Sequence, residues 1–249
     1  MQKEKTYKII VAYDGTNYCG WQRQPQVSTV VGVLEQRFQA VFKTEIALLG
    51  ASRTDAGVHA LGQVARFRTT LSIGIEQLKN AWNNVLPADI IIRELTQVED
   101  TFNPQHNVAQ KTYYYHFFQR RPLPFVYRYG AYYKPTIDLE KLTECLNVFV
   151  GTHDFRSFCT GQDKENTIRT IHSITVNSFK KYGFYRITIK GPGFLRYMIR
   201  RIVGACLDSA CTPELTKEHL ITALAEKNPS QKFDTAPARG LILRKIVYK

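Results

Sequence analysis

The segment Gly50-Ala-Ser-Arg-Thr-Asp-Ala-Gly-Val-His-Ala60 places one acid, Asp55, between two glycines. Both glycines permit backbone angles that residues with a Cβ avoid, so the chain here can approach another molecule closely. The residues that follow the segment alternate in a way that predicts a half-buried strand. The same composition is typical of an ordinary turn between two strands, with Arg53 as a solvated neighbour. The segment therefore predicts a tight loop that carries a carboxylate, and its residues alone leave the role of that carboxylate open.

The bulk composition is that of a globular protein with a strong excess of positive charge. Of the 249 residues, 44% are hydrophobic and 22% are charged, and 34 basic against 21 acidic side chains give a net charge of +13. An excess of this size suits a polyanionic partner, although charge alone does not distinguish RNA from DNA or an anionic membrane. No apolar run approaches the roughly 18 residues of a membrane span, and the polar residues 1–6 predict no signal peptide.

The cysteines and histidines indicate neither disulfides nor a metal. The five cysteines are odd in number and include no Cys-x-x-Cys pair, and the six histidines are scattered. This pattern argues against a disulfide framework and against a zinc site, and it fits a protein of the reducing cytoplasm. We expect no metal and no cofactor.

The first 105 residues alternate strands and helices. Strands are expected at 7–14, 46–49, 63–69 and 90–95, and helices at about 30–43 and 75–86. Ser28 or Thr29 is expected to cap the first helix, and Pro87 to end the second. The order strand, helix, strand, strand, helix, strand is that of a ferredoxin-like split β-α-β unit.

Residues 106–249 repeat this order of elements without visible repetition of sequence. Strands are expected at 111–118, 168–179, 185–190 and 241–248, and helices at about 139–149, 194–207 and 213–225. Arg196 and Arg200 are expected at the border of the apolar stripe of the 194–207 helix. Two such halves, 1–105 and 106–249, predict an α+β protein with one mixed, largely antiparallel sheet, helices on one face and an open face on the other.

Two loops combine aromatic and polar side chains. In the loop 16–27, Tyr18 and Trp21 stand among Gln22, Arg23 and Gln24. This loop suits contact with RNA, and it is equally typical of a surface loop whose tryptophan packs on the core. The second loop holds Arg120, Arg121 and Arg128 between prolines and further aromatic residues, which also suits RNA.

Several segments, in order, resemble the TruA family of tRNA pseudouridine synthases. The most specific of these matches is the segment of eight residues Arg53–Ala60, which resembles the signature of that family. The other matching segments are Tyr13–Thr16 with Gly20–Gln22, Lys111–Tyr115, Phe194–Arg200 and Ala236–Leu243. The resemblance spans nearly the whole chain and implies the pseudouridine synthase fold, with an RNA-binding cleft on the open face of the sheet.

The resemblance also implies roles for individual residues. Asp55 is implied to be the nucleophile, Tyr113 to stack on the flipped uracil and help remove its C5 proton, and Arg200 to be the partner of the aspartate. A guanidinium within about 4–6 Å favours the ionised form of a carboxylate, and a bidentate contact fixes the direction of its oxygens. Leu241 is implied to be an apolar wall of the uridine pocket. The remaining substrate-binding positions are expected to be Arg53, Trp21, Gln22, Arg23 and Arg196.

The chain departs from the family pattern at two places. Ser52 stands where family members usually have glycine, and Phe102-Asn-Pro-Gln105 replaces a usual Phe-His-Ala-Arg. The loss of that arginine at Gln105 puts one phosphate or base contact in doubt. Neither departure falls on Asp55, Tyr113 or Arg200.

The function implied by the resemblance is an isomerase that converts uridine to pseudouridine at positions 38, 39 and 40 of the anticodon arm of tRNA. It also implies a cytoplasmic homodimer whose partner is tRNA. Two alternatives stay open: a pseudouridine synthase for another RNA site, and a non-catalytic tRNA-binding protein or chaperone.

Overall fold

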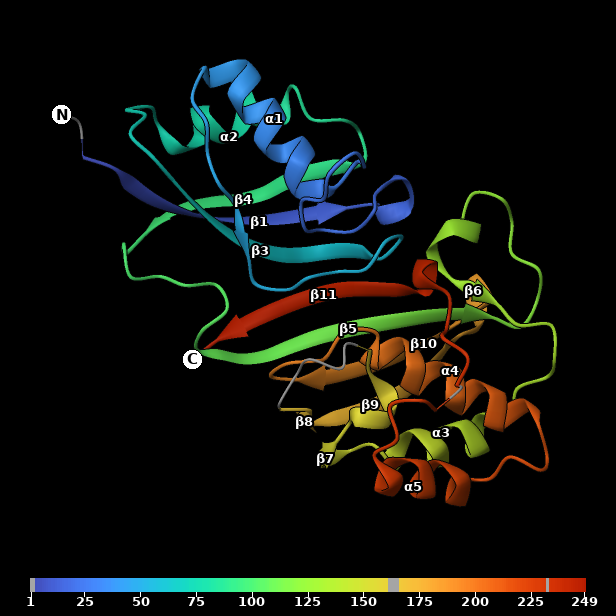
Figure 1. Cartoon of the computed structure of the whole chain (residues 1–249). Coiled ribbons are helices and arrows are strands. Elements are labelled where there is room, and N and C mark those ends of the chain that lie inside the picture. Colours follow the sequence, from blue (N-terminus) through green and yellow to red (C-terminus); the bar gives the residue numbers. More distant parts are fainter. Residues whose placement is uncertain (1–2, 161–165, 232) are drawn as a thin grey trace. The chain divides into compact units, whose positions relative to one another are not determined.

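The computed structural model describes residues 3–160, 166–231 and 233–249, which form two compact units (Figure 1). The N-terminal unit takes in the described residues up to Val108 together with Leu243–Lys249, and the C-terminal unit takes in Ala109–Ile242. The last strand, β11, therefore begins in the second unit and ends in the first.

The N-terminal unit is an antiparallel sheet with two helices. Its elements are β1 (Lys5–Tyr13), α1 (Val30–Phe42), β2 (Leu49–Gly50), β3 (His59–Thr69), α2 (Ile75–Asn83) and β4 (Ile90–Val98). The strand order is β4-β1-β3, with β2 paired to β3, and each of these pairs is antiparallel. β11 (Leu241–Tyr248) lies next to β3. The expected order of elements is therefore confirmed in this unit.

The core of the N-terminal unit lies between its sheet and its two helices (Figure 1). The rings of Phe38 on α1, Phe67 on β3 and Trp82 on α2 meet edge to face, with centroids 4.8–5.6 Å apart. All three side chains are nearly inaccessible to solvent. α1 begins where the sequence predicts, because the Thr29 hydroxyl accepts the Gly32 N–H at 3.2 Å. This packing holds the sheet from which the Asp55 loop projects.

The C-terminal unit combines antiparallel strands with three helices. Its sheet order is β5-β10-β9, and β6 joins the edge of β5 in parallel. β7 and β8 form a separate two-stranded sheet. The bounds are β5 (Val108–Phe118), β6 (Ala131–Tyr132), α3 (Leu139–Asn147), β7 (Gly151–Asp154), β8 (Ile168–Ile171), β9 (Ser173–Phe179), β10 (Phe184–Gly191), α4 (Met198–Cys211) and α5 (Lys217–Glu226).

The α+β class and the largely antiparallel pairing are confirmed, but several boundaries differ from expectation. The strand expected over 168–179 is interrupted at His172, whose N–H donates to the Lys190 carbonyl; β8 then pairs with β7, and β9 with β10. The strand expected over 46–49 is reduced to Leu49–Gly50. α2 ends at Asn83 instead of reaching residue 86, α3 ends at Asn147, and α5 starts only at Lys217.

The helix expected over 194–207 begins four residues later, at Met198. Tyr197 has a φ of 61°, in the left-handed region, and this conformation interrupts the helix before it can extend toward residue 194. Arg196 therefore precedes the helix, and the prediction that places it on the helix beside Arg200 is wrong. The expected apolar stripe is buried as predicted, including Met198, Ile202 and Cys206.

Candidate active site

Asp55 lies half-buried on the loop between β2 and β3. The backbone of this loop is held by the segment that follows β1. The Trp21 backbone N–H donates to the Thr54 carbonyl at 3.2 Å, and the Gly57 N–H donates to the Tyr18 carbonyl at 3.2 Å. The residues on both sides of Asp55 are thus tied to residues 18–21, and the position of the carboxylate depends on them.

Two glycines of residues 14–21 allow this close approach. Gly20 has a φ of 89°, and a Cβ on it would lie 2.5 Å from the Thr54 carbonyl oxygen. A Cβ on Gly15 would collide with the Val58 carbonyl oxygen. These contacts explain in physical terms why the stretches Tyr13–Thr16 and Gly20–Gln22 accompany the Asp55 segment: they form the support of its loop.

Two aromatic side chains complete the support. The Tyr13 hydroxyl and the Thr54 hydroxyl share a buried hydrogen bond of 2.8 Å. Trp21 is 1% exposed, its ring stacks on Tyr13 at a centroid distance of 5.9 Å, and Gly50 leaves room for its indole. Of the two interpretations of Trp21, the packing of its ring on the core is the one that the structure shows.

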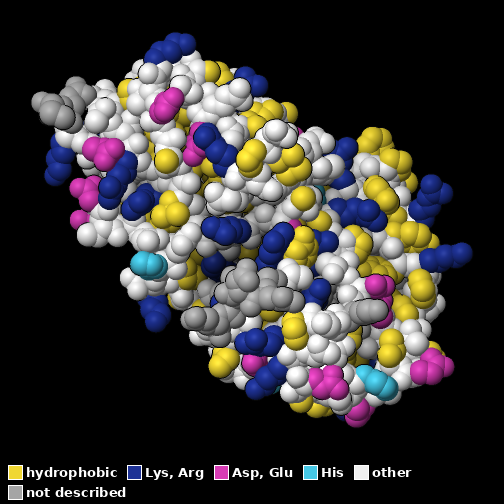
Figure 2. Space-filling model, viewed as in Figure 1, with side chains coloured by type: hydrophobic (Ala, Val, Ile, Leu, Met, Phe, Trp, Pro, Cys, Tyr) yellow, Lys and Arg dark blue, Asp and Glu magenta, His cyan; other side chains and the backbone are white. Residues whose placement is uncertain are grey.

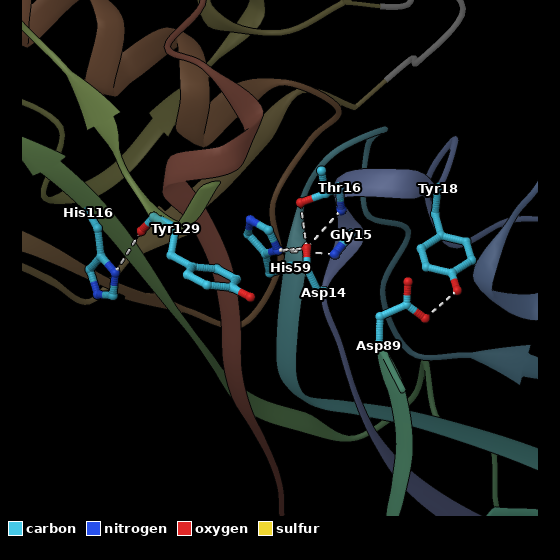
Figure 3. Close-up of polar contacts among 8 residues, drawn as sticks. All are labelled: Asp14, Gly15, Thr16, Tyr18, His59, Asp89, His116 and Tyr129. Atoms are coloured by element: carbon cyan, nitrogen blue, oxygen red, sulfur yellow. Dashed lines mark hydrogen bonds and ion pairs between the residues drawn. The ribbon is translucent and has the colours of Figure 1, made fainter. Parts of the chain in front are cut away.

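His59, at the start of β3, holds the turn that follows β1 (Figure 3). Its Nδ1 accepts the Gly15 N–H at 3.0 Å and lies 3.1 Å from the Asp14 carboxylate. The same carboxylate accepts the Thr16 N–H at 3.0 Å and the Thr16 hydroxyl at 2.5 Å. Sequence reasoning assigned no role to His59 or Asp14, although both lie within the matching segments. Their types and spacing gave no sign that they would meet.

The other residues expected on this side lie at the surface. Arg53, Gln22 and Arg23 are exposed, and Arg23 forms an ion pair of 2.5 Å with Glu35. Gln105, one of the two departures from the family pattern, donates from its side-chain amide to the Gly50 carbonyl at 3.0 Å. That amide therefore contacts the strand that leads into the Asp55 loop.

Tyr113 lies on β5 in the C-terminal unit and is 6% exposed. It stands opposite Ile189 of β10, and its ring meets the Phe194 ring edge to face at 5.4 Å. Lys111, two residues earlier on the same face of β5, is half-buried, and the loss of solvent around its ammonium group lowers the pKa of that group to about 8.

Arg200 lies in the first turn of α4, and two features fix its guanidinium. Its Nε donates to the Ala236 carbonyl at 2.8 Å, and the Ala236 N–H donates back to the Arg200 carbonyl at 3.0 Å. Its guanidinium also lies over the Tyr197 ring, 5.2 Å from the centroid. The exposed Arg196 lies over the same ring at 5.1 Å. One strained tyrosine thus contacts both arginines.

The segment 236–241 brings Leu241 to the same part of the C-terminal unit. The Tyr115 hydroxyl donates to the Pro237 carbonyl at 3.1 Å. A Cβ on Gly240 would lie 2.6 Å from the Tyr115 ring, so only glycine fits against β5 there. Leu241 is 6% exposed at the start of β11. Since Arg200 also binds this segment, at Ala236, the segment links α4 to β5.

The N-terminal unit therefore carries the acid on a braced loop, and the C-terminal unit carries the ring, the guanidinium and the apolar residue. These groups are a carboxylate, a phenol and a guanidinium that is fixed within its own unit. In the described part of the chain, no group of three or more His, Cys, Asp or Glu side chains could hold a metal ion, and no helix is long and apolar enough to cross a membrane.

Comparison with known proteins identifies the family. The family model described as tRNA pseudouridine synthase matches residues 9–106 and 146–249. A tRNA pseudouridine synthase A of Thermodesulfovibrio yellowstonii is 40% identical over 97% of this chain and 98% of its own length. The protein of that name from Thermoanaerobacter pseudethanolicus is 38% identical over 96% and 98% of the two chains. A chain from a solved Cbf5-Nop10-Gar1 complex aligns at a TM-score of 0.34 and 10% identity, over 78% of this chain and 43% of that one, a level that supports no conclusion. The two sequence comparisons show that this chain belongs to the tRNA pseudouridine synthase family.

Proposed function

We propose that this protein converts uridine to pseudouridine in tRNA, at positions 38, 39 and 40 of the anticodon arm. The proposal rests on family membership over most of the chain and on full-length relatives named tRNA pseudouridine synthase A. The observation that carries it is Asp55, an acid on a loop that Tyr18, Trp21 and Tyr13 brace from one side. A binding protein without turnover has no need to fix a carboxylate in this way.

The reaction breaks the bond between uracil N1 and ribose C1′, turns the detached base, and forms a bond between C5 and C1′. N1 gains a proton and C5 loses one, so the product is an isomer of the substrate. Asp55 is the proposed nucleophile. Tyr113 is proposed to stack on the base and to help remove the C5 proton in the last step.

Arg200 is proposed to act with Asp55, to keep the carboxylate ionised and to direct its oxygens. The bonds between Arg200 and Ala236, and its contact with Tyr197, give the guanidinium a fixed direction within its own unit. Leu241 is proposed as an apolar wall for the uracil. Arg53, Gln22, Arg23 and Arg196 are proposed to bind the RNA, because all four side chains are exposed.

The net charge of +13 supports tRNA as the substrate. A uridine that is stacked in RNA must leave the stack to react, at a cost of a few kcal/mol, and contacts with the phosphates can offset that cost. We further propose that the enzyme works in the cytoplasm as a homodimer, and light scattering of the purified protein tests the dimer.

The direct test of the proposed function is release of tritium from tRNA labelled at uracil C5. The purified protein should release one equivalent of tritium for each uridine converted, and sequencing should place the pseudouridines at positions 38–40. Tight tRNA binding without tritium release would favour the non-catalytic alternative. Release of tritium from other sites in tRNA, or from another RNA, would favour a pseudouridine synthase of different specificity. The change at Gln105 leaves that alternative open.

The role of Arg200 needs two variants. Arg200→Ala removes the charge and the bond to Ala236, while Arg200→Lys keeps the charge but loses the planar fork of donors. In both variants the rate of turnover should fall strongly, while thermal stability should fall little. If Arg200→Lys turned over tRNA at the wild-type rate, the directing role of the guanidinium would be excluded.

A further inference from the structure

One surface segment of the C-terminal unit combines exposed apolar residues with arginines. We name residues 120–128, Arg-Arg-Pro-Leu-Pro-Phe-Val-Tyr-Arg, the 120–128 loop. Leu123 is 70% exposed, Phe125 87% and Tyr127 48%, and the three arginines are exposed as well. Consecutive apolar residues are unfavourable where they face water, so an exposed run of them on a protein surface indicates a binding site.

The base of this loop is firmly held. The chain after the loop returns along β5, where the Tyr133 N–H donates to the Phe118 carbonyl at 2.9 Å and β6 pairs with β5. His116 Nδ1 lies 3.2 Å from the Tyr129 carbonyl (Figure 3). Because the Arg186 Nε donates to His116 Nε2 at 2.9 Å, that nitrogen accepts, and Nδ1 is the one that donates to Tyr129. The exposed tip thus projects from an ordered support.

The loop is also connected to the segment that carries Leu241. The Arg239 guanidinium lies over the Tyr127 ring, 4.5 Å from the centroid, and its Nε donates to the Gly130 carbonyl at 3.3 Å. Arg239 is two residues from Leu241. If a uracil of the RNA contacts Leu241, the nucleotides next to that uracil would therefore lie close to the 120–128 loop.

The charge of the region favours RNA over a second copy of the chain. Residues 101–137 contain no aspartate and no glutamate, while Arg120, Arg121, Arg128 and Lys134 lie in or beside the loop. Figure 2 shows Lys and Arg side chains beside hydrophobic ones on the side of the C-terminal unit where the green loop before β6 projects. At a two-fold interface formed by this loop, the arginines of both copies would face one another with like charge. Single-stranded RNA offers both phosphates for guanidinium groups and base faces for exposed rings.

We infer that the 120–128 loop binds tRNA beside the target nucleotide, with its arginines on phosphates and the Phe125 ring stacked on an unpaired base. The inference rests on the proposed function for the identity of the RNA. It adds a binding surface that the motifs of the family segments do not include.

The test compares variants of the full-length protein by their affinity for unmodified tRNA over a range of salt concentrations. Arg120→Ala/Arg121→Ala should weaken binding and reduce the slope of log K against log salt by roughly 0.7–0.9 for each phosphate that the loop no longer binds. Phe125→Ala should weaken binding about 5- to 150-fold. Phe125→Leu should weaken it similarly, because leucine keeps the apolar area but cannot stack, and Phe125→Tyr should bind as the wild type does.

Lys217→Ala is the matched control, because it removes one exposed charge from α5 of the same unit, where Lys217 pairs with Glu144 at 3.7 Å. Its affinity and salt slope should stay unchanged. The loop variants should also keep the wild-type molar mass by light scattering.

Two results would overturn the inference. The first is that the loop variants keep the wild-type affinity and salt slope. The second is that Phe125→Ala changes the molar mass while Phe125→Leu does not, which would mark a protein interface. Failure of the proposed function gives a different result. In that case the wild-type protein would release no tritium, whereas the loop variants would still lose affinity for RNA.

Discussion

Replacement of Gly20 by alanine should move the Asp55 loop without changing any of the proposed catalytic side chains. A Cβ on Gly20 would lie 2.5 Å from the Thr54 carbonyl oxygen, and real Cβ contacts essentially never fall below 3.0 Å. The carbonyl must therefore retreat by at least 3.0 − 2.5 = 0.5 Å. Since Thr54 directly precedes Asp55, the carboxylate should move with it.

The expected loss follows from this displacement. A misplacement of 1 Å can cost about 100-fold in rate, so half that displacement should slow turnover about tenfold. The left-handed conformation of Gly20 adds a backbone cost of about 1–2 kcal/mol for a residue with a Cβ. For a chain of this size, that cost lowers Tm by about 2–8 °C.

Gly183→Ala provides the matched control. Gly183 also has a left-handed φ, of 67°, but nothing lies within 4 Å of a Cβ built on it. This variant should lose a similar amount of stability from backbone strain and keep the wild-type turnover. The assay is the initial rate of tritium release from tRNA labelled at uracil C5, alongside thermal unfolding. Equal turnover by the Gly20 and Gly183 variants would refute the claim that residues 18–21 position the acid.

Two further substitutions test the support and the core. Tyr13→Phe removes a buried hydrogen bond of 2.8 Å to Thr54, so it should lower the free energy of unfolding by about 1 kcal/mol and reduce kcat with little change in KM, as steady-state kinetics and denaturant unfolding can show. Burial, with the charge of Asp234 second, raises the pKa of Asp208 to about 6. The folded state then holds this proton more tightly than the unfolded chain, whose carboxyl titrates near 4, so stability should fall as pH rises from about 4 to 6 and stay lower above that. Asp208→Asn should remove this fall and raise Tm at pH 7.5 by about 2–4 °C, allowing for screening of a half-exposed carboxyl; an unchanged pH profile of Tm would contradict the assignment.

The elements that the sequence predicts well are those with a strong local signal. α1 has both a capping threonine and helical spacing of apolar residues, and β11 has a β-prone run after Gly240, so both are found at the predicted residues. The start of α4 was predicted wrongly because apolar spacing does not reveal that Tyr197 takes a left-handed φ. The interruption at His172 depends on two different partner strands, which no local pattern contains.

The same distinction applies to the candidate site. The resemblance singles out Asp55, Tyr113 and Arg200 by residue type, and their roles stay predictions. The support of the Asp55 loop could not be predicted, because the contacts of Gly15 with Val58 and of Gly20 with Thr54 join residues more than thirty positions apart. Trp21 shows the limit most clearly: its neighbours Gln22 and Arg23 suggested RNA, while its ring packs inside the protein.

The central claim is that the carboxylate of Asp55 performs the chemistry, and single-turnover tritium release with Asp55→Asn tests it most directly. Asparagine keeps the size of the side chain and removes only its charge and nucleophilicity, and Asp55→Ala serves as a second variant that cannot revert by deamidation. Both variants should release no tritium above background while binding tRNA within a few-fold of the wild-type protein, because the positive surface supplies most of the affinity. Tritium release by Asp55→Ala at a rate near that of the wild type would contradict the account.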